Sequence, residues 1–168
     1  EHDIGLINNS KVVDVQKIGD VILHRVNKVT VEEGEVVSCT VDKERREILR
    51  KHHTATHIIN AAARKVLGSW VWQAGSEKTV EKARLDITHY EGLSEEQVAR
   101  IEQEANRIVK RNLPVRKTFL PRSEAEQKYG FRIYQGGAVP SKTIRIVEIP
   151  GVDVEACGGM HCNSTGEV

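Results

Sequence analysis

The chain has 168 residues, a length typical of one compact domain or of one domain with a small annex. Its hydrophobic fraction of 39% is enough for a core, and its aromatic fraction of 4% predicts that this core is aliphatic. No apolar run reaches the ~20 residues that a membrane-spanning helix needs, and no secretory leader is visible, so we expect no membrane partner. The formal net charge of +1 neither supports nor excludes a nucleic-acid partner.

The three cysteines, Cys39, Cys157 and Cys162, are odd in number and widely spaced, which argues against a disulfide framework. We therefore expect a cytoplasmic protein, because in a reducing compartment cysteine serves as a core residue, a metal ligand or a nucleophile. The sequence begins with Glu1 rather than methionine and stops at Val168. We expect it to be part of a longer protein.

The first part of the chain, residues 1–42, is rich in β-branched side chains interrupted by glycine and predicts a small barrel or sheet. Its expected strands are residues 11–17, 20–26 and 35–41. A long helix follows over residues 43–67, capped by Asp42 and ended by Gly68. The pattern therefore predicts a β-rich segment, 1–42, ahead of a second domain at 43–168.

The second part alternates between strands and helices. A capping box, Ser94-x-x-Gln97, predicts a helix over residues 95–112, and Ser123 caps a short third helix that ends at Gly130. The expected strands are residues 70–74, 84–90, 115–120, 143–149 and 152–156. Chain breaks are expected at Gly136, Gly137 and Pro140. The predicted fold class is α+β, with a mixed or antiparallel sheet backed by helices.

Two pairs of side chains carry a metal-binding pattern. His53 and His57 are four residues apart in the first helix, so they project on nearly the same side, one turn apart. Cys157 and His161 follow the last strand and are separated by two glycines and a methionine, which permits a tight backbone path. Three imidazoles and one thiolate are a zinc set rather than a calcium or magnesium set.

The neighbouring histidine and cysteines have simpler interpretations. His52 points about 100° away from the histidine pair and is not expected to be a ligand. Cys39 fits the core of a strand, and Cys162 is expected to be a bystander.

These motifs resemble the editing domain of alanyl-tRNA synthetases, which is related to free-standing trans-editing proteins and to the editing domain of threonyl-tRNA synthetases. The similar segments are HTATH at 53–57, QAGS at 73–76, RLDITH at 84–89, EACGGMH at 155–161 and NSTGE at 163–167. Residues 1–42 resemble, less specifically, the small barrel that precedes this domain. Met160 departs from the threonine that is common in the family.

The resemblance implies a zinc-dependent hydrolase that removes serine or glycine wrongly attached to the 3′ acceptor end of alanine tRNA. It implies one Zn²⁺ held by His53, His57, Cys157 and His161. ATP would belong only to the aminoacylation domain of the host synthetase, and the rest of that synthetase would be a partner. The candidate catalytic residues are Thr54, Thr56, Gln73 and Asp86, and His89 is a candidate acid or base.

Several alternatives remain open at this point. The metal either activates water or anchors the substrate, since four protein ligands would close a tetrahedral site. The threonine hydroxyls either face the cleft or bond back to the helix backbone. The glycines around 136 and 137 either allow close approach of the terminal adenosine or form a plain turn. The rival functions are a free-standing deacylase, a zinc-stabilised tRNA-binding module without catalysis, and a zinc hydrolase of another small ester or amide.

Overall fold

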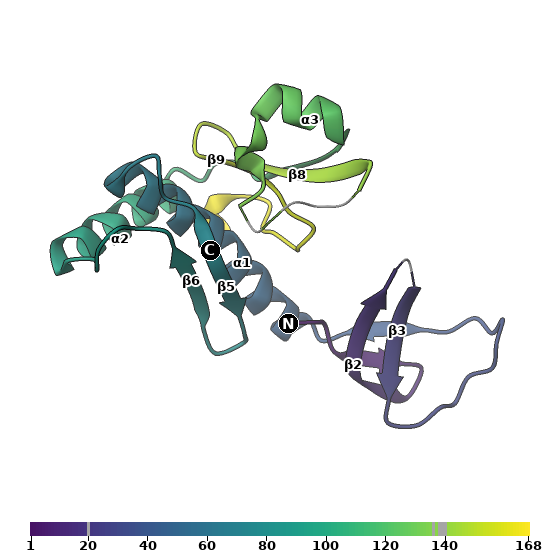
Figure 1. Cartoon of the computed structure of the whole chain (residues 1–168). Coiled ribbons are helices and arrows are strands. Elements are labelled where there is room, and N and C mark those ends of the chain that lie inside the picture. The colour runs from purple at the N-terminus through teal and green to yellow at the C-terminus, as the bar shows by residue number, and fades with distance from the viewer. Residues whose placement is uncertain (20, 136, 138–140) are drawn as a thin grey trace. The chain divides into compact units, whose positions relative to one another are not determined.

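The computed structural model describes residues 1–19, 21–135, 137 and 141–168, and divides the chain into two compact units (Figure 1). The first unit is Glu1–Leu49 and the second is Arg50–Val168. The chain breaks predicted at Gly136 and Pro140, and the first residue of the strand predicted at 20–26, lie outside the described residues.

The first unit contains an antiparallel sheet with the strand order β3-β2-β1-β4. Its strands are β1 (Gly5–Ile7), β2 (Ser10–Ile18), β3 (Val21–Val26) and β4 (Cys39–Val41). Asn8, with φ of 51°, makes the turn between β1 and β2, a conformation that asparagine tolerates. The described residues leave β3 and β4 as two open edges, so they form no closed barrel.

The strand predicted at 35–41 is confined to β4, and Cys39 is exposed rather than part of a core. Cys39 pairs with Ile7 on a three-residue edge strand, which offers little surface to cover a side chain. The prediction of a core role for this cysteine is therefore wrong.

Both long helices begin at the predicted caps. α1 (Lys43–Leu67) follows Asp42, whose carboxylate accepts from the Arg45 N–H at 3.0 Å, and it ends at Gly68, with φ of 131°. α2 (Glu95–Lys110) has the complete capping box between Ser94 and Gln97. These ends were predictable because short polar side chains satisfy the first free N–H groups of a helix.

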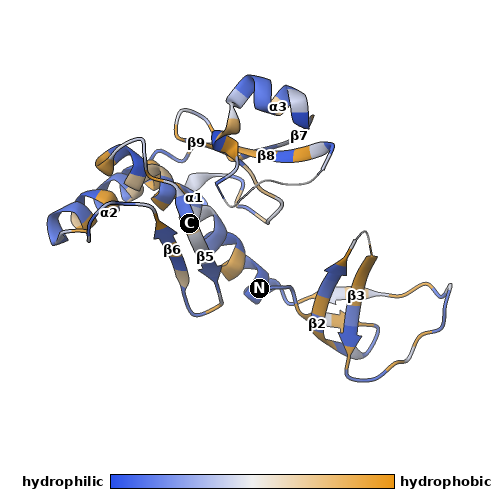
Figure 2. Ribbon diagram, viewed as in Figure 1, coloured by the Kyte–Doolittle hydropathy of each residue, from blue (hydrophilic) through white to orange (hydrophobic). Residues whose placement is uncertain are grey.

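The second unit is built on a three-stranded antiparallel sheet in the order β7-β8-β9. Its strands are β7 (Arg116–Pro121), β8 (Thr143–Ile149) and β9 (Asp153–Ala156). Side chains alternate along β8, so Ile144 and Ile146 pack with α3 (Arg122–Tyr129), while Val147 and Ile149 pack with α1 and α2. Figure 2 shows the contrast between the hydrophobic β8 and the largely hydrophilic α3.

A hairpin of β5 (Gln73–Lys78) and β6 (Ala83–Ile87) completes the second unit, and Ile87 packs into the core formed by α1 and α2. Both strands are shifted from their predicted ranges. α3 begins directly after β7 at Arg122, with Pro121 at its N-cap and no side-chain capping bond, so the predicted cap at Ser123 is wrong. Two 3₁₀ turns, Phe131–Ile133 and Thr165–Glu167, were not predicted.

The α+β fold class is confirmed by three α-helices and antiparallel sheets among the described residues. None of the helices in the described ranges combines the length and the apolarity that crossing a membrane requires.

Thr165 ties the end of the chain to the end of α2. Its buried hydroxyl donates to the Ile108 carbonyl at 3.0 Å and accepts from the Leu113 N–H at 2.9 Å. Thr165→Val keeps the shape but removes the partner of the Leu113 N–H and one of the bonds to the Ile108 carbonyl, which should lower the free energy of unfolding by about 1–3 kcal/mol in urea titrations. Thr118→Val, on the exposed side of β7, is the control, and an equal loss there would contradict this role.

Candidate metal centre

One stripe of α1 carries four polar side chains. His53, His57, Asn60 and Arg64 recur at intervals of four, three and four residues, which places them within a narrow arc of the helix. His57 and Asn60 are buried, whereas His53 and Arg64 are half-buried. The stripe therefore faces the interior of the protein, where each of its polar groups needs a hydrogen-bond or ion-pair partner.

β9 and the loop after it provide those partners. Asp153 and Glu155 are buried on the strand and Cys157 follows at the same two-residue spacing, so the three side chains share one face. Arg145 of β8 holds the loop, since its Nη1 donates to the carbonyls of Cys157 at 3.1 Å and of Gly159 at 2.5 Å. This arrangement presents an acidic, sulfur-containing surface to the α1 stripe.

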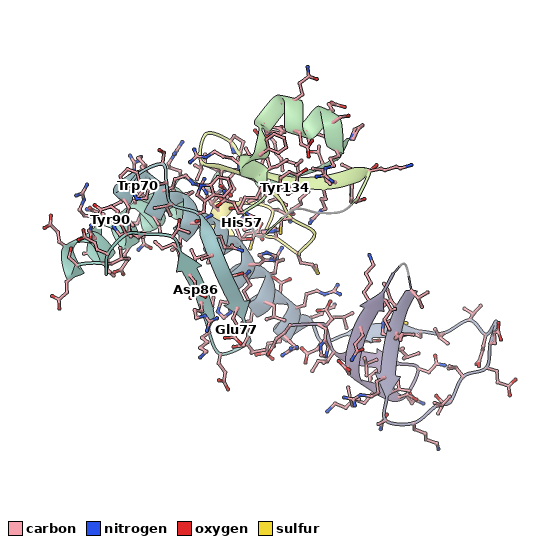
Figure 3. All side chains as sticks on the ribbon, in the orientation of Figure 1. His57, Trp70, Glu77, Asp86, Tyr90 and Tyr134 are labelled. Atoms are coloured by element: carbon pink, nitrogen blue, oxygen red, sulfur yellow. The ribbon has the colours of Figure 1, made fainter. Side chains whose placement is uncertain are left out.

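The four predicted ligands meet at one point. Cys157 Sγ lies 3.3 Å from His53 Nε2 and 3.3 Å from His161 Nε2, and the donor atoms of these residues and His57 all lie within 4.8 Å of one another. The three imidazole centroids are 4.2 to 5.4 Å apart. Figure 3 labels His57 on α1, near the yellow C-terminal segment.

The geometry of this group fits a zinc ion. Sulfur at ~2.3 Å and nitrogen at ~2.0–2.1 Å from a tetrahedral zinc lie roughly 3.5 Å from each other, close to the observed 3.3 Å. A Cβ atom built on Gly159 would overlap the His53 ring, so glycine is needed for the loop to reach this close. The nitrogen and sulfur donors are of the type that zinc prefers.

Two ligand rings are fixed by hydrogen bonds on their far side. Asp153 Oδ2 lies 3.2 Å from His57 Nδ1, and Thr54 Oγ1 lies 3.2 Å from His161 Nδ1. Asp153 also accepts from Arg64 Nη1 at 3.3 Å. Such outer partners set the tautomer and orientation of a metal-ligating histidine, which leaves the Nε2 atoms free to face Cys157.

The surroundings favour an ionised Cys157. Burial opposes ionisation of its thiol, but hydrogen bonds from His161, His53 and His57 outweigh burial and lower the pKa of Cys157 to about 2. Burial also lowers the pKa of His161 to about 4, with the neighbouring His57 and His53 adding to this effect and Cys157 opposing it. A thiolate beside a neutral imidazole is the protonation state that zinc ligation requires.

His57 and Glu155 lie side by side, and each affects the ionisation of the other. Burial disfavours the imidazolium of His57, yet hydrogen bonds to Asp153 and Cys157 and the charges of both carboxylates raise its pKa to about 10. Burial raises the pKa of Glu155 to about 7 against the attraction of His57, whose Nε2 lies 3.4 Å from its Oε2. The negative groups around His57 thus stabilise a positive charge at this position, and a metal cation would supply such a charge as well as a proton does.

A buried amide network connects the centre to β5. Asn60 Nδ2 donates to Glu155 Oε1 at 3.0 Å and to Gln135 Oε1 at 3.2 Å. The same Gln135 oxygen accepts from the Gln73 backbone N–H at 3.2 Å. Sequence reasoning missed Asn60, Gln135, Asp153 and Glu155. The acidic residues at alternate positions of the apolar strand β9, and Asn60 one turn after His57, were signals that could have found them.

The two threonines between the ligands have different surroundings. Thr54 Oγ1 donates to the Arg50 carbonyl at 3.2 Å and accepts from the Cys162 N–H at 3.0 Å, besides its contact with His161. Thr56 Oγ1 donates to the His52 carbonyl at 2.8 Å, the helix back-bond that was one of its two interpretations. Both side chains are buried.

The remaining predicted residues lie outside the ligand cluster. Gln73 begins β5 and reaches the centre through its backbone contact with Gln135. Asp86 is exposed on β6 (Figure 3), pairs with Arg84 at 3.3 Å, and lies over Gly75. His89 contacts Trp70 and Tyr90. His52 Nδ1 lies 2.8 Å from the Thr79 carbonyl, away from the ligands.

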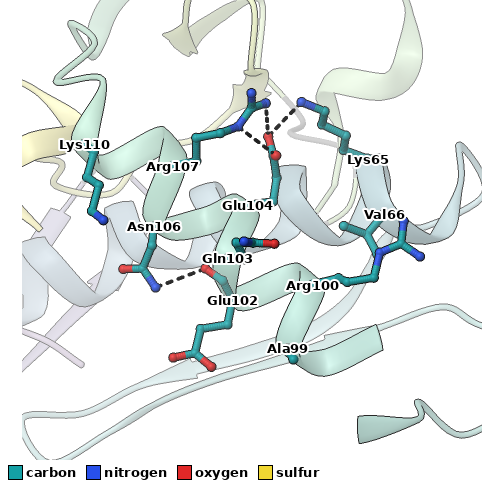
Figure 4. A pocket seen from close by; sticks show the side chains of 10 residues that line it. All are labelled: Lys65, Val66, Ala99, Arg100, Glu102, Gln103, Glu104, Asn106, Arg107 and Lys110. Atoms are coloured by element: carbon teal, nitrogen blue, oxygen red, sulfur yellow. Dashed lines mark hydrogen bonds and ion pairs between the residues drawn. The ribbon is translucent and has the colours of Figure 1, made fainter. Parts of the chain in front are cut away.

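A large hollow on the surface of the second unit is unrelated to this chemistry. It has a volume of about 960 Å³ and lies along the charged outer side of α2, next to Lys65 and Val66 of α1 (Figure 4). Glu104 forms ion pairs there with Lys65 and Arg107, both at 2.8 Å. None of the four candidate ligands lines this hollow, so its size carries no argument about the site.

One half of the ligand cluster lies in a segment that matches a domain family of tRNA synthetases. Residues 144–168 match the family described as the threonyl and alanyl tRNA synthetase second additional domain, and this range includes Cys157 and His161. Together with the relatives of the whole chain, this match confirms that the chain resembles an editing-type domain.

The relatives of the whole chain are alanine–tRNA ligases. The chain is 55% identical over 169 residues to the alanine–tRNA ligase of Methanococcus maripaludis strain C7, covering 100% of this chain and 19% of that protein. It is 53% identical over 168 residues to the Nitrosopumilus maritimus protein, with the same coverage. The Methanopyrus kandleri protein is 53% identical over 159 residues, covering 95% of this chain and 17% of that protein. The chain thus spans about a fifth of the length of these relatives.

Proposed function

We propose that this chain binds one Zn²⁺ through His53, His57, Cys157 and His161 and hydrolyses the ester between a wrong amino acid and alanine tRNA. The wrong amino acids are serine and glycine, attached to the 3′-terminal adenosine. The observation that carries the proposal is the convergence of three imidazoles and one thiolate in a chain whose relatives are alanine–tRNA ligases. The host synthetase is the proposed partner of the chain.

The need for such an activity follows from the size of the amino acids. A pocket that accepts the methyl group of alanine cannot exclude glycine, which is smaller. A site of this kind discriminates only ~100-fold against an added hydroxyl group, so serine is also attached to the tRNA at times. A second, hydrolytic site removes the products that the first site lets through.

The side chains around the cluster would have separate tasks. Asp153 and Thr54 hold the rings of His57 and His161, with the His161 Nε2 facing the thiolate and the His57 Nε2 beside Glu155. The buried Glu155, with Asn60 fixing one oxygen, is positioned to accept a proton or hydrogen bond beside the cluster. When bound, zinc supplies a Lewis acid that polarises an ester carbonyl or a water molecule.

The test is deacylation of three charged forms of alanine tRNA by the full synthetase that contains this chain and by the 168-residue chain itself. We expect seryl- and glycyl-tRNA to be hydrolysed and alanyl-tRNA to be largely spared. Equal rates for seryl- and alanyl-tRNA would exclude editing. Zinc binding without hydrolysis of any of the three would leave a tRNA-binding module.

Thr56 is the proposed contact for the serine hydroxyl. Since its own hydroxyl donates to the His52 carbonyl, it is left to accept a hydrogen bond from the seryl group. Thr56→Val keeps the shape and should slow seryl-tRNA hydrolysis about tenfold, because a neutral hydrogen bond contributes roughly 1 kcal/mol. Glycyl-tRNA hydrolysis and zinc content should stay unchanged. Equal slowing with both substrates would assign Thr56 to the helix rather than to the substrate.

A further inference from the structure

An aromatic surface lies at the C-terminal end of α1, apart from the ligand cluster. The chain has only two tryptophans and three tyrosines, and Trp70 and Tyr90 come together here with His89 (Figure 3). Trp70 is 52% exposed and Tyr90 is 76% exposed. In a chain this poor in aromatic residues, a cluster of exposed rings requires an explanation beyond core packing.

Trp70 and His89 form one extended flat surface, which we call the aromatic platform together with Tyr90. Trp70 Nε1 donates to His89 Nδ1 at 3.2 Å, and the two ring planes differ by only 14°. The two rings are thus nearly parallel and joined by a hydrogen bond, with 6.4 Å between their centroids. Tyr90 follows at 4.4 Å from the His89 centroid, tilted by 37°.

The backbone holds this platform in place. Thr88 donates its hydroxyl proton to the Trp70 carbonyl at 2.9 Å and accepts from the Trp72 N–H at 2.9 Å. The six-membered ring of Trp70 lies directly against Gly68, where a Cβ atom would overlap it. The platform is therefore ordered before any ligand arrives, which lowers the entropy that binding must overcome.

A cation lies next to the platform. The Arg132 guanidinium is 5.9 Å from the Trp72 ring centroid and donates to the Ser69 carbonyl, beside Trp70. Flat exposed rings with an adjacent arginine are the combination with which proteins bind unpaired nucleobases, because every base has a face to stack and a phosphate to neutralise.

We propose that the aromatic platform binds an unpaired nucleobase of RNA, a few nucleotides before the 3′ end. The end of α1 at Leu67 lies ~15 Å along the helix axis from His57, and stacked nucleotides advance ~3.4 Å each. An unpaired strand is more extended than a stacked one, so a 3′-terminal adenosine at the ligand cluster places the platform at most a few nucleotides upstream. This proposal rests on the proposed function for its RNA partner, which the relatives named alanine–tRNA ligase support.

The platform is linked to the centre through Arg64 of α1. Its Nε donates to the Val71 carbonyl at 3.4 Å, next to Trp70, and its Nη1 contacts Asp153 at 3.3 Å, which fixes the His57 ring. The platform is therefore connected, through Arg64, to the same helix that carries the two candidate histidine ligands.

The experiment compares two uncharged RNA hairpins, one with a few unpaired nucleotides at its 3′ end and one with a blunt end. Trp72→Phe keeps a ring beneath Arg132 and leaves Trp70 as the single tryptophan, so its emission reports stacking. We expect the hairpin with the overhang to quench Trp70, and Trp70→Ala and Tyr90→Ala to weaken its binding roughly 5- to 100-fold in anisotropy titrations. Because Tyr90 is mostly exposed, its variant tests the platform without risk to folding.

The control is Phe119→Ala, an equally exposed aromatic residue on β7, which should bind both hairpins like the unchanged chain. Equal affinity for the two hairpins, unchanged Trp70 emission at saturation, or the same loss in Phe119→Ala would each overturn the proposal. The hairpins carry no amino acid, so these outcomes are independent of hydrolysis. Loss of the overhang preference with intact deacylation would reject the platform alone.

Discussion

Cys157→Ala should abolish zinc binding and, with it, the hydrolysis of seryl-tRNA. Sγ of this residue lies between the Nε2 atoms of His53 and His161 and is the only sulfur in the cluster. Loss of an outer-shell partner alone weakens metal affinity 10- to 100-fold as a rough range, and loss of a ligand should exceed it. Elemental analysis should find about one zinc per chain before the change and almost none after it.

His57→Ala should behave in the same way, and Cys39→Ser is the matched control because Cys39 is exposed and belongs to the first unit. The control should keep its zinc and its activity. Full zinc occupancy in both Cys157→Ala and His57→Ala would contradict the assignment of the metal centre. Loss of zinc with full hydrolysis would instead separate the metal from the reaction.

Asp153→Ala should cause the largest loss of stability near the centre. Its carboxylate is almost completely buried and serves two positively charged or polar partners, His57 and Arg64. Removal of one side of a buried pair leaves the others without compensation and costs about 3–5 kcal/mol. Urea unfolding should report this loss, and zinc titration should show affinity reduced roughly 10- to 100-fold.

Glu104→Ala provides the comparison for Asp153→Ala. Glu104 also has two cationic partners, Lys65 and Arg107, but both of these are more than half exposed. Ion pairs at the surface contribute little because water and salt screen them. A loss of stability in Glu104→Ala as large as that in Asp153→Ala would show that burial of the Asp153 network is not the source of the effect.

The ligand cluster was predictable because its spacings are local. His53 and His57 follow helical periodicity, and Cys157 and His161 lie four residues apart around two glycines, so each pair can be recognised without knowing the fold. Their convergence is tertiary, since it depends on the packing of Val147 and Ile149 of β8 against α1. The resemblance to a known domain was therefore needed to predict that the two pairs lie together.

The side chains around the ligand cluster were not all predictable in the same way. Gln135 follows a 3₁₀ turn and hydrogen-bonds Asn60, which lies 75 positions earlier in the chain, so no local pattern indicates this contact.

Asp86 was a candidate catalytic residue because the segment around it resembles a known domain. In the structure it lies exposed on a hairpin and pairs with Arg84. Hairpin register decides which side of β6 a residue faces, and a shift of one position reverses it.

Helix ends were the best-predicted part of the fold, and short strands the worst. Ser94 and Asp42 mark helix starts through side-chain bonds to nearby N–H groups, which are local. α3 lacks such a bond because Pro121 at the end of β7 precedes it directly. Strands β1 and β4 have three residues each, too few for an alternating pattern to stand out.

The two halves of the ligand set lie 104 positions apart along the chain, at His53 and Cys157. During synthesis on the ribosome, α1 therefore emerges long before the thiolate that completes its histidine pair. A nascent chain that stops short of Cys157 holds only two of the four proposed ligands, too few to retain a zinc ion tightly. If the chain binds zinc as proposed, zinc capture is a late event that follows the docking of β8 and β9 on α1, and the closure of so long a loop slows this step.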